Sequence, residues 1–513
     1  MNQPLKNLGS IGDEYRDEPR PVIIDLWDPS NPREIDYPTF HASCDAIARG
    51  FVKRGFTKGE RIGIFCSNRL EFLETFFGAM RAGVIPVPIG ILLPRDTVDW
   101  IVRDASLKLV FCDAELHAKL PEDVPSIVVE SVAYADFKDP GAFDALIPSG
   151  DDVAFQPYTS GSTGRPKGVV LSHRAHVWVA ETISRDRDFD RNDRMIVAAP
   201  LYHKHAMNAI KSVLVGGSTV VLMKKFEPRA YLDAVIRYRV SVLSGVPTIF
   251  AMILQQRDLI ASSDFSAVRL ATLGGAPASD ELIDAVANVL PNAEIICIFG
   301  ITETSAALFG SHPRKMPRPR HSIGYPIAGN EFRLVDGPDD SFGILHVRGP
   351  GMMNGYHNNQ AEMAKRMKDG WYNTGDVLRK DEDGWYYFIG RSDDMFVCSG
   401  NNIYPGEVEL MLERHPDIDQ AVVVPVPDEI KHQIPYAYVV RRKGSDLAEQ
   451  DVKDHALKHA PPYQYPRRVI FVDALLMNGV GKIDRNAIKA LALEFSRTER
   501  SATAEAGMRT EGA

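Results

Sequence analysis

A segment rich in hydroxyl side chains and glycines, residues 158–168, is the part of the sequence best suited to bind an anion. It reads Tyr-Thr-Ser-Gly-Ser-Thr-Gly-Arg-Pro-Lys-Gly. Glycine allows close approaches that a Cβ would hinder, so this loop can aim backbone N–H groups and hydroxyls at a phosphate, beside a lysine charge. It is not a Walker A loop, because the lysine lacks the preceding glycine and the following serine or threonine. The alternative is a flexible surface turn. The candidate ligands are Thr159, Ser160, Gly161, Ser162, Thr163, Gly164 and Lys167.

Charged side chains further along the chain suit a nucleotide and a metal ion. Glu303 is a hard oxygen donor of the kind Mg²⁺ prefers, and Thr302 beside it can bond a phosphate oxygen. Asp376 can accept both ribose hydroxyls, and Arg391 can bind ribose or phosphate oxygens. Lys482 offers a cation on a glycine-rich segment. The plain alternative for each is a surface charge, or a surface ion pair worth about 0–1 kcal/mol.

Five segments, in this order, resemble the signature motifs of the adenylate-forming superfamily, which includes acyl- and aryl-CoA synthetases, luciferases and peptide-synthetase adenylation domains. The resemblance covers nearly the whole chain. It implies that a carboxylic acid is joined to AMP with release of pyrophosphate, and that the acyl group then passes to a thiol. It further implies ATP, Mg²⁺ and coenzyme A as the small molecules involved. The segments are 158–168, 299–303 (Phe-Gly-Ile-Thr-Glu), 372–376 (Tyr-Asn-Thr-Gly-Asp), 390–409 and 478–485 (Asn-Gly-Val-Gly-Lys-Ile-Asp-Arg).

The resemblance implies roles for individual residues in the first half-reaction. Glu303 is expected to bind Mg²⁺, Thr302 and Thr163 to bind phosphate, with Thr163 also close to the metal, and Lys482 to bridge the substrate carboxylate and the α-phosphate. The remaining expected nucleotide contacts are Gly275, Ala276, Pro277, Phe299, Gly300, Ile301, Asp376 and Arg391.

A second set of implied roles concerns thiol transfer. Asp393 matches the family's hinge, about which a small domain rotates so that one site serves both half-reactions. Gly400 is then expected to line the pantetheine tunnel. Arg467 and Arg468 are candidate contacts for the phosphates of coenzyme A, with simple surface placement as the alternative. Many family members carry a lysine shortly after the hinge, whereas residues 395–399 are uncharged here, so thiol transfer is not expected to depend on a lysine there.

Residues 201–208 (Leu-Tyr-His-Lys-His-Ala-Met-Asn) fall at the family's aromatic gate, and His203 matches the gate residue. Lys204 and His205 are unusual neighbours for an aliphatic pocket. They favour a hydroxylated, aromatic or dicarboxylic acid, unless they point to solvent or to coenzyme A. No aspartate lies in the gate region to hold an amine, which disfavours an α-amino acid. The other expected acyl contacts are Gly274, Ile298, Gly300, Ser305 and Ala306.

Helix-like and strand-like segments alternate in the part of the chain that must position these residues. Helical spacing over 37–54 and 70–82 alternates with short apolar runs such as 61–66 and 84–89, and the pattern resumes after residue 170 with runs including 219–223 and 294–298. This alternation predicts an α/β fold with parallel sheets and helices on their faces. The resemblance implies a large N-terminal domain of layered β-sheets flanked by helices, and a small mobile α+β C-terminal domain. The expected boundaries are 1–390 for the large domain, 391–394 for the hinge, 395–495 for the small domain and 496–513 for a disordered tail.

Composition excludes several other classes. The 513 residues are 44% hydrophobic and 25% charged, as in globular proteins, and the net charge of −9 disfavours nucleic acid as a partner. Five scattered cysteines form no CxxC pattern, which favours a reducing, cytoplasmic location. The most apolar stretch, 76–93, contains an arginine and two prolines, so we expect a helix end and a strand there rather than a membrane span. A homodimer stays open. Two alternatives to a CoA ligase also stay open: a ligase that loads a carrier protein, and a non-catalytic binder of acyl-adenylate.

Overall fold

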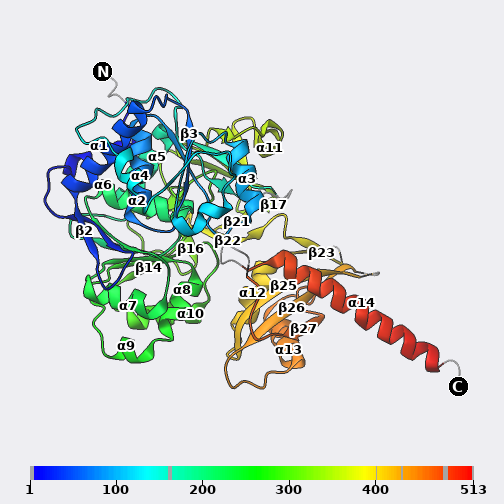
Figure 1. The fold of residues 1–513 in the computed structure, drawn as a ribbon. Helices are drawn as coiled ribbons and strands as arrows, with labels where there is room; N and C mark the ends of the chain where they lie inside the picture. The colour runs from blue at the N-terminus through cyan, green and yellow to red at the C-terminus, as the bar shows by residue number, and fades with distance from the viewer. Residues whose placement is uncertain (1–4, 160–164, 400, 429–430, 478–482, 511–513) are drawn as a thin grey trace.

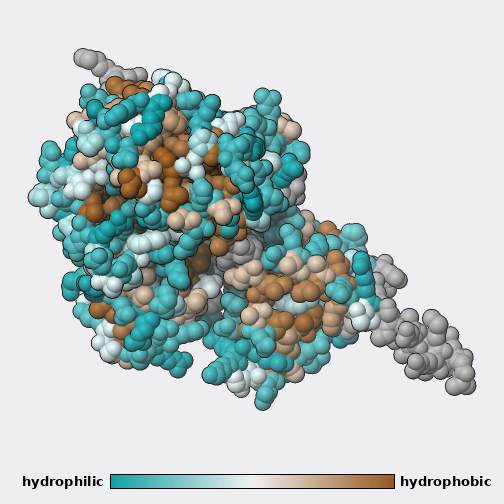
Figure 2. All heavy atoms as spheres, in the orientation of Figure 1, coloured by the Kyte–Doolittle hydropathy of each residue, from teal (hydrophilic) through white to brown (hydrophobic). Residues whose placement is uncertain are grey.

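The protein, seen here in a computed structural model, has a large N-terminal domain and a small C-terminal domain. The structure describes residues 5–159, 165–399, 401–428, 431–477 and 483–510, of which 499–510 are described by their backbone alone. The two ends of the chain lie on opposite sides of the molecule (Figure 1). Figure 2 shows the molecule in the same orientation as Figure 1. The visible face is mainly hydrophilic, with apolar patches on both domains and a hollow between the domains.

Two parallel sheets form the frame of the large domain. The first has seven strands in the order β14-β13-β12-β10-β11-β1-β2, of which β2 alone runs antiparallel to its neighbour. The second has four parallel strands in the order β4-β3-β5-β6. The strands are β1 (Pro21–Leu26), β2 (Arg33–Asp36), β3 (Arg61–Phe65), β4 (Ile85–Pro88), β5 (Val110–Cys112), β6 (Ser126–Val128), β10 (Arg194–Val197), β11 (Thr219–Met223), β12 (Val242–Gly245), β13 (Leu270–Gly274) and β14 (Glu294–Ile298).

Two antiparallel sheets complete the large domain. One has the order β15-β16-β22-β21-β18-β17 with β20 against β21, and the other joins β19, β9 and β7 with β8 against β9. The strands are β7 (Val153–Phe155), β8 (Tyr158–Thr159), β9 (Lys167–Ser172), β15 (Phe309–Gly310), β16 (Ser322–Pro326), β17 (Glu331–Asp339), β18 (Phe342–Arg348), β19 (Gly355–Tyr356), β20 (Met367–Lys368), β21 (Trp371–Lys380) and β22 (Tyr386–Arg391).

Helices cover both faces of the seven-stranded sheet, because its central strands are apolar on both faces. Neighbouring residues such as Val220 and Val221 point to opposite faces and enter different hydrophobic clusters. The helices of this domain are α1 (Tyr37–Lys53), α2 (Leu70–Arg81), α3 (Arg95–Asp104), α4 (Val132–Phe137), α5 (His173–Asp186), α6 (Lys204–Val215), α7 (Pro228–Arg237), α8 (Pro247–Leu254), α9 (Arg257–Ala261), α10 (Asp280–Val289) and α11 (Gln360–Arg366), with 3₁₀ turns at η1 (Leu8–Ser10), η2 (Asp13–Tyr15) and η3 (Ala114–Lys119).

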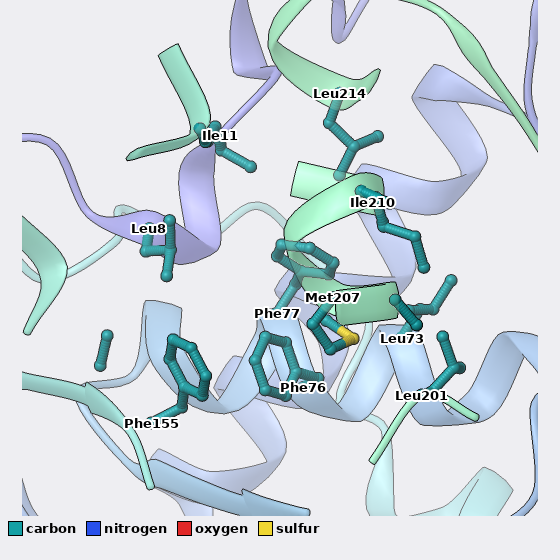
Figure 3. Packing of buried hydrophobic residues seen from close by; sticks show 14 of the residues in the cluster. Leu8, Ile11, Leu73, Phe76, Phe77, Phe155, Leu201, Met207, Ile210 and Leu214 are labelled. Atoms are coloured by element: carbon teal, nitrogen blue, oxygen red, sulfur yellow. The ribbon is translucent and has the colours of Figure 1, made fainter. Parts of the chain in front are cut away.

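Capping and apolar spacing account for the helices that support the site. The side chains of Asp36 and Ser172 accept backbone N–H groups at the starts of α1 and α5. Leu73, Phe76 and Phe77 of α2 pack beside Met207 and Ile210 of α6 in the larger cluster (Figure 3). This packing fixes α6, whose first residues lie in the candidate gate.

The small domain has a five-stranded sheet in the order β24-β23-β26-β25, with β27 parallel to β26. Its elements are β23 (Phe396–Cys398), β24 (Asn401–Ile403), α12 (Pro405–Glu413), β25 (Ile418–Asp428), β26 (His432–Arg441), α13 (Glu449–His459), β27 (Arg468–Phe471) and α14 (Arg485–Thr510). Instead of the expected disordered tail from residue 496, the structure has α14 continuing to Thr510 and extending away from the domain (Figure 1). Alanine, glutamate and arginine are frequent in that stretch, and their high helix propensity explains the difference.

Within the described part of the chain, no helix combines the length and the apolarity that a membrane span needs. The apolar stretch 76–93 contains the end of α2 and all of β4, as the sequence indicated.

Candidate active site

Two loops that carry predicted nucleotide contacts leave the seven-stranded sheet side by side. Strands β13 and β14 are parallel neighbours, with Gly274 opposite Ile298 at their carboxyl ends. A Cβ at Gly274 would stand 2.6 Å from the Cγ1 of Ile298, so glycine is required for the two loops to be this close. Gly275 follows with a φ of +82°, which glycine adopts without strain. The predicted 275–277 and 299–303 segments are therefore neighbours.

The first residues of α6 contact the second of these loops. The Lys204 ammonium donates a hydrogen bond to the Thr302 carbonyl. This lysine is 9% exposed, and burial lowers its pKa to about 7, against the opposing effect of the Glu303 charge. His203 precedes the helix, with its ring centroid 4.5 Å from that of Tyr202. The hydrogen bond from Lys204 to Thr302 thus joins the gate segment to the 299–303 loop.

A chain of polar side chains runs from α6 into the sheet. His205 Nε2 lies 2.9 Å from the Ser244 Oγ of β12, and the Thr272 hydroxyl of β13 donates to the same Oγ at 2.7 Å. Ser244 and Thr272 are buried. His205 thus contacts β12, the neighbour of β13, which ends at the predicted acyl contact Gly274.

The Glu303 carboxylate contacts one tyrosine, Tyr356, and that tyrosine contacts a second, Tyr372. The Tyr356 hydroxyl donates to the Glu303 Oε1 at 2.8 Å and lies 2.9 Å from the Tyr372 hydroxyl. Burial, together with the nearby glutamate charge, raises the pKa of both tyrosines, so both remain protonated at neutral pH.

Asp376 and Arg391 are cross-strand partners on β21 and β22. Arg391 donates to the Asp376 Oδ1 at 3.0 Å, and through Nε and Nη2 it also binds both Asp393 oxygens at 3.0 and 3.2 Å. Asp376 is 3% exposed, and its Oδ2 has no hydrogen-bond partner among the described residues. Burial raises the pKa of Asp376 to about 6, although Arg391 opposes the shift, and the Glu303 charge adds to it.

The ends of the glycine-rich loop are held by a short hairpin. Thr159 of β8 pairs with Lys167 of β9. The Lys167 ammonium binds the Glu362 carboxylate of α11 at 2.5 Å, and this hydrogen bond is the main reason that the pKa of Glu362 is lowered. Lys167 Nζ also lies 5.5 Å from the centroid of the Tyr356 ring.

The carboxylates described above fit Mg²⁺ that is bound together with ATP. Among the described residues no group of three or more His, Cys, Asp and Glu could hold a metal ion. A single carboxylate, Glu303, fits Mg²⁺ that is bound mainly by substrate phosphates. The buried Asp376 Oδ2 fits a ribose hydroxyl, because an unpartnered buried acceptor is costly until a donor reaches it.

The other predicted residues have different outcomes. Phe299 is half-buried, with its ring centroid 5.9 Å from Phe309 and 6.0 Å from Phe388. Ser305 is buried and forms an isolated bridge with Ile301, which holds Ala306 in the same tight loop. The predicted ligands Ser160, Gly161, Ser162, Thr163, Gly164, Gly400 and Lys482 lie outside the described residues.

The two candidate CoA arginines have neighbours in the small domain. The Arg467 guanidinium lies 3.7 Å from the Tyr465 ring centroid, and Arg468 is paired with Glu449 at 3.8 Å. These contacts do not join either arginine to the residues around Glu303.

Tyr356, Tyr372 and Glu362, which lie beside predicted site residues, were not predicted from the sequence. Tyr372 begins a recognised motif but carries no sequence signal of its own, and Tyr356 lies in none. Their positions depend on the pairing of β19 with β9 and on the place of β21, which are tertiary features.

Comparison with known proteins agrees with this architecture. The family model described as "AMP-binding enzyme" matches residues 15–357, and that of the "AMP-binding enzyme C-terminal domain" matches 407–482. The chain is 30% identical to 4-coumarate–CoA ligase 3 of Arabidopsis thaliana (90% of this chain, 87% of the relative). It is 28% identical to the fatty acid–acyl-carrier-protein ligase ScoC of Streptomyces coeruleorubidus (89% and 91%). The crystal structure of ATP-bound MatB from Rhodopseudomonas palustris superimposes with a TM-score of 0.86 at 26% identity (95% and 99%). The chain therefore belongs to the AMP-binding enzyme family, in the adenylate-forming superfamily.

Proposed function

We propose that the protein is an ATP-dependent acid–CoA ligase that works through an acyl-adenylate. The observation that carries the proposal is the buried Asp376 Oδ2, which has no hydrogen-bond partner among the described residues and so fits a ribose hydroxyl. Relatives named as CoA ligases support the thiol acceptor, and the ATP-bound structural neighbour supports the nucleotide.

In the first half-reaction a carboxylate oxygen of the acid attacks the α-phosphorus of ATP. The bond from that phosphorus to the bridging oxygen breaks, and pyrophosphate leaves with the electron pair. Asp376 and Arg391 hold the ribose, and Thr302 holds phosphate oxygens. When bound, Mg²⁺ supplies charge neutralisation between the two anions. Lys482 stabilises the negative charge that develops at the α-phosphate.

In the second half-reaction the thiol of coenzyme A releases its proton to the solvent, and its sulfur attacks the acyl carbon. The bond from that carbon to the AMP oxygen breaks, and AMP leaves. Rotation of the small domain about Asp393 removes Lys482 and brings in the segment around Gly400. Arg467 and Arg468 bind phosphates of coenzyme A.

The acid itself carries a polar or aromatic group. The support is the polar His205–Ser244–Thr272 chain, which lies along β12 and β13 near the predicted acyl contact Gly274. Hydroxylated, aromatic and dicarboxylic acids are the favoured classes.

A pyrophosphate-release screen tests the proposal. Aryl, hydroxyaryl, dicarboxylic and straight-chain acids are offered with ATP and Mg²⁺, and active acids are tested again for a thioester after addition of coenzyme A. Acid-dependent pyrophosphate release followed by a CoA thioester is the expected result. Release with none of these acids would remove the case for an enzyme and favour a non-catalytic binder.

A carrier protein is the second candidate acceptor. The resemblance to ScoC, whose name gives an acyl-carrier protein as its acceptor, is the observation that favours it. Comparing free coenzyme A with a phosphopantetheinylated carrier protein at equal concentration separates the two. A thioester on the carrier alone would overturn the CoA assignment while leaving the adenylate chemistry in place.

A further inference from the structure

Tyr356 lies where it can control the position of Glu303. Its side chain is 9% exposed, and its hydroxyl is 2.8 Å from the Glu303 Oε1. An ionised carboxylate can only accept hydrogen bonds, so the tyrosine is the donor. A hydrogen bond to a charged acceptor is stronger and more directional than a neutral one.

The Tyr372 hydroxyl determines the direction of this contact. It is buried and lies 2.9 Å from the Tyr356 oxygen. Each phenol has one proton, and that of Tyr356 is used on Glu303, so Tyr372 must donate to Tyr356. The result is a one-way chain from Tyr372 through Tyr356 to the carboxylate. Buried chains of this kind strengthen each of their hydrogen bonds.

The backbone around Tyr356 is connected to both sides of the site. Strand β19 pairs with β9, the strand that begins at Lys167 beside the glycine-rich loop, with Tyr356 opposite Val169. Just before β19, the Met353 N–H donates to the Glu303 carbonyl at 2.9 Å. Segment 353–356 thus holds both the main chain and the side chain of Glu303, in register with the end of the phosphate loop.

From this geometry we propose that Tyr356 is a positioning residue for the metal–nucleotide complex, and that Tyr372 supports it. Its hydroxyl holds one oxygen of Glu303 and so aims the carboxylate at the metal ion that ATP carries. Without the hydroxyl the carboxylate would turn among several rotamers, and each metal-binding event would have to order it again. The inference rests on the proposed function, since it needs Glu303 to meet Mg²⁺.

The test is Tyr356→Phe, which keeps the ring and removes the hydroxyl. Mn²⁺ binding is measured by electron paramagnetic resonance with a non-hydrolysable ATP analogue and no acid, so that no turnover is needed. We expect Mn²⁺ to bind about tenfold more weakly, as for loss of a hydrogen bond to a charged group. The Mg²⁺ concentration for half-maximal pyrophosphate release should rise by a similar factor, and adenosine affinity should stay unchanged.

Two further variants make the result specific. Tyr372→Phe leaves the contact between Tyr356 and Glu303 in place but removes its support, so a smaller loss of Mn²⁺ affinity is expected. Tyr231→Phe is the matched control, because that buried hydroxyl has no partner among the described residues and its loss should change nothing. If Tyr356→Phe does not fold, Tyr372→Phe alone carries the test.

Two outcomes would overturn the inference, and they can be told apart. Wild-type Mn²⁺ affinity in both folded variants would mean that the tyrosines only fill space. A wild-type enzyme that binds no Mn²⁺ with nucleotide and releases no pyrophosphate would remove the proposed function together with this role.

Discussion

A single oxygen atom, the Oδ2 of Asp376, shows how burial prepares this site for a ligand. The other oxygen is held by Arg391 at 3.0 Å, while Oδ2 is buried with no partner among the described residues. The charged form is therefore only half compensated, which is why the pKa of this acid is raised to about 6 in spite of its arginine. A hydroxyl that donates to Oδ2 would supply the missing hydrogen bond.

Asp376→Asn tests this account. The folded pKa is above the ordinary 3.8, so the folded protein binds the extra proton, and this contribution to stability is lost as pH rises from about 4 to 6. Binding of ribose by the charged carboxylate depends on pH in the opposite direction, so ribose affinity weakens as pH falls through about 6. We expect adenosine to bind roughly 10- to 100-fold more weakly to the variant near pH 8, with no pH dependence around 6.

Calorimetric titration with adenosine suits this measurement, because adenosine carries no phosphate that titrates in the same range. An unchanged affinity at pH 8 would contradict a ribose role for Asp376.

Lys204 gives the opposite case, a buried base. Its pKa of about 7, against an ordinary 10.5, means that the unfolded chain holds the proton more tightly between pH 7 and 10.5, so the stability of the large domain rises with pH in that window. Lys204→Met removes the buried charge and should stabilise the domain by roughly 1–4 kcal/mol below pH 7, with the gain vanishing toward pH 10.5.

Denaturant unfolding at pH 6 and pH 9.5 checks the prediction for Lys204. Lys225→Met, at an exposed position two residues after the end of β11, is the control and should change stability at neither pH. A variant less stable than the wild type at pH 6 would show that the hydrogen bond to Thr302 outweighs the cost of burying the charge.

At the scale of the element, α14 is held by its first turns. Ile488 is 1% exposed and Ala492 is fully buried, and both pack on the β25 face formed by Val422, Val424 and Val426. Leu491 points away and is 46% exposed. The helix therefore depends on a few contacts near the motif that carries Lys482.

Ile488→Ala should destabilise the small domain by about 2–4 kcal/mol, because it leaves a cavity between α14 and the sheet. Hydrogen exchange of the α14 and β25 amides in the full chain measures this as a loss of protection. Leu491→Ala is the control and should stay within about 0.5 kcal/mol of the wild type. Equal loss in the two variants would contradict the packing described here.

Elements with a strong local pattern could be predicted from the sequence, and those that depend on partners could not. The helical spacing of 37–54 and 70–82 became α1 and α2 within one residue, and the runs 219–223 and 294–298 became β11 and β14. Strand β1 was missed. Its place beside β11, nearly 200 residues later, is determined by tertiary pairing.

The candidate site divides in the same way. Side-chain chemistry and the family resemblance led to the prediction of Glu303, Asp376 and Arg391 as ligands. The sequence could not indicate that Tyr356 would contact Glu303 or that Tyr372 would contact Tyr356, because those contacts follow from two separate strand pairings. The predicted domain boundaries and the roles of the predicted site residues stay predictions.

At the scale of the whole molecule, the proposed rotation implies that Lys482 serves one half-reaction only. Lys482→Ala should lower acid-dependent ATP–pyrophosphate exchange about 10²- to 10³-fold, as for loss of a group that stabilises developing charge. Thioester formation from supplied acyl-AMP should fall far less. Lys489→Ala, an exposed lysine on α14, is the matched control. Equal loss of both half-reactions in the Lys482 variant would contradict the rotation.

Arg391 has a consequence that reaches across the molecule. Its guanidinium donates hydrogen bonds to Asp376, the proposed ribose ligand, and to both oxygens of Asp393, at the proposed hinge. In the proposed rotation, a change of backbone angle at Asp393 would alter these hydrogen bonds and so the electrostatic potential at Asp376. By thermodynamic linkage, a nucleoside bound at Asp376 would then shift the equilibrium between the two hinge orientations by the same free energy. Arg391 would thus couple nucleoside binding to the orientation of the small domain.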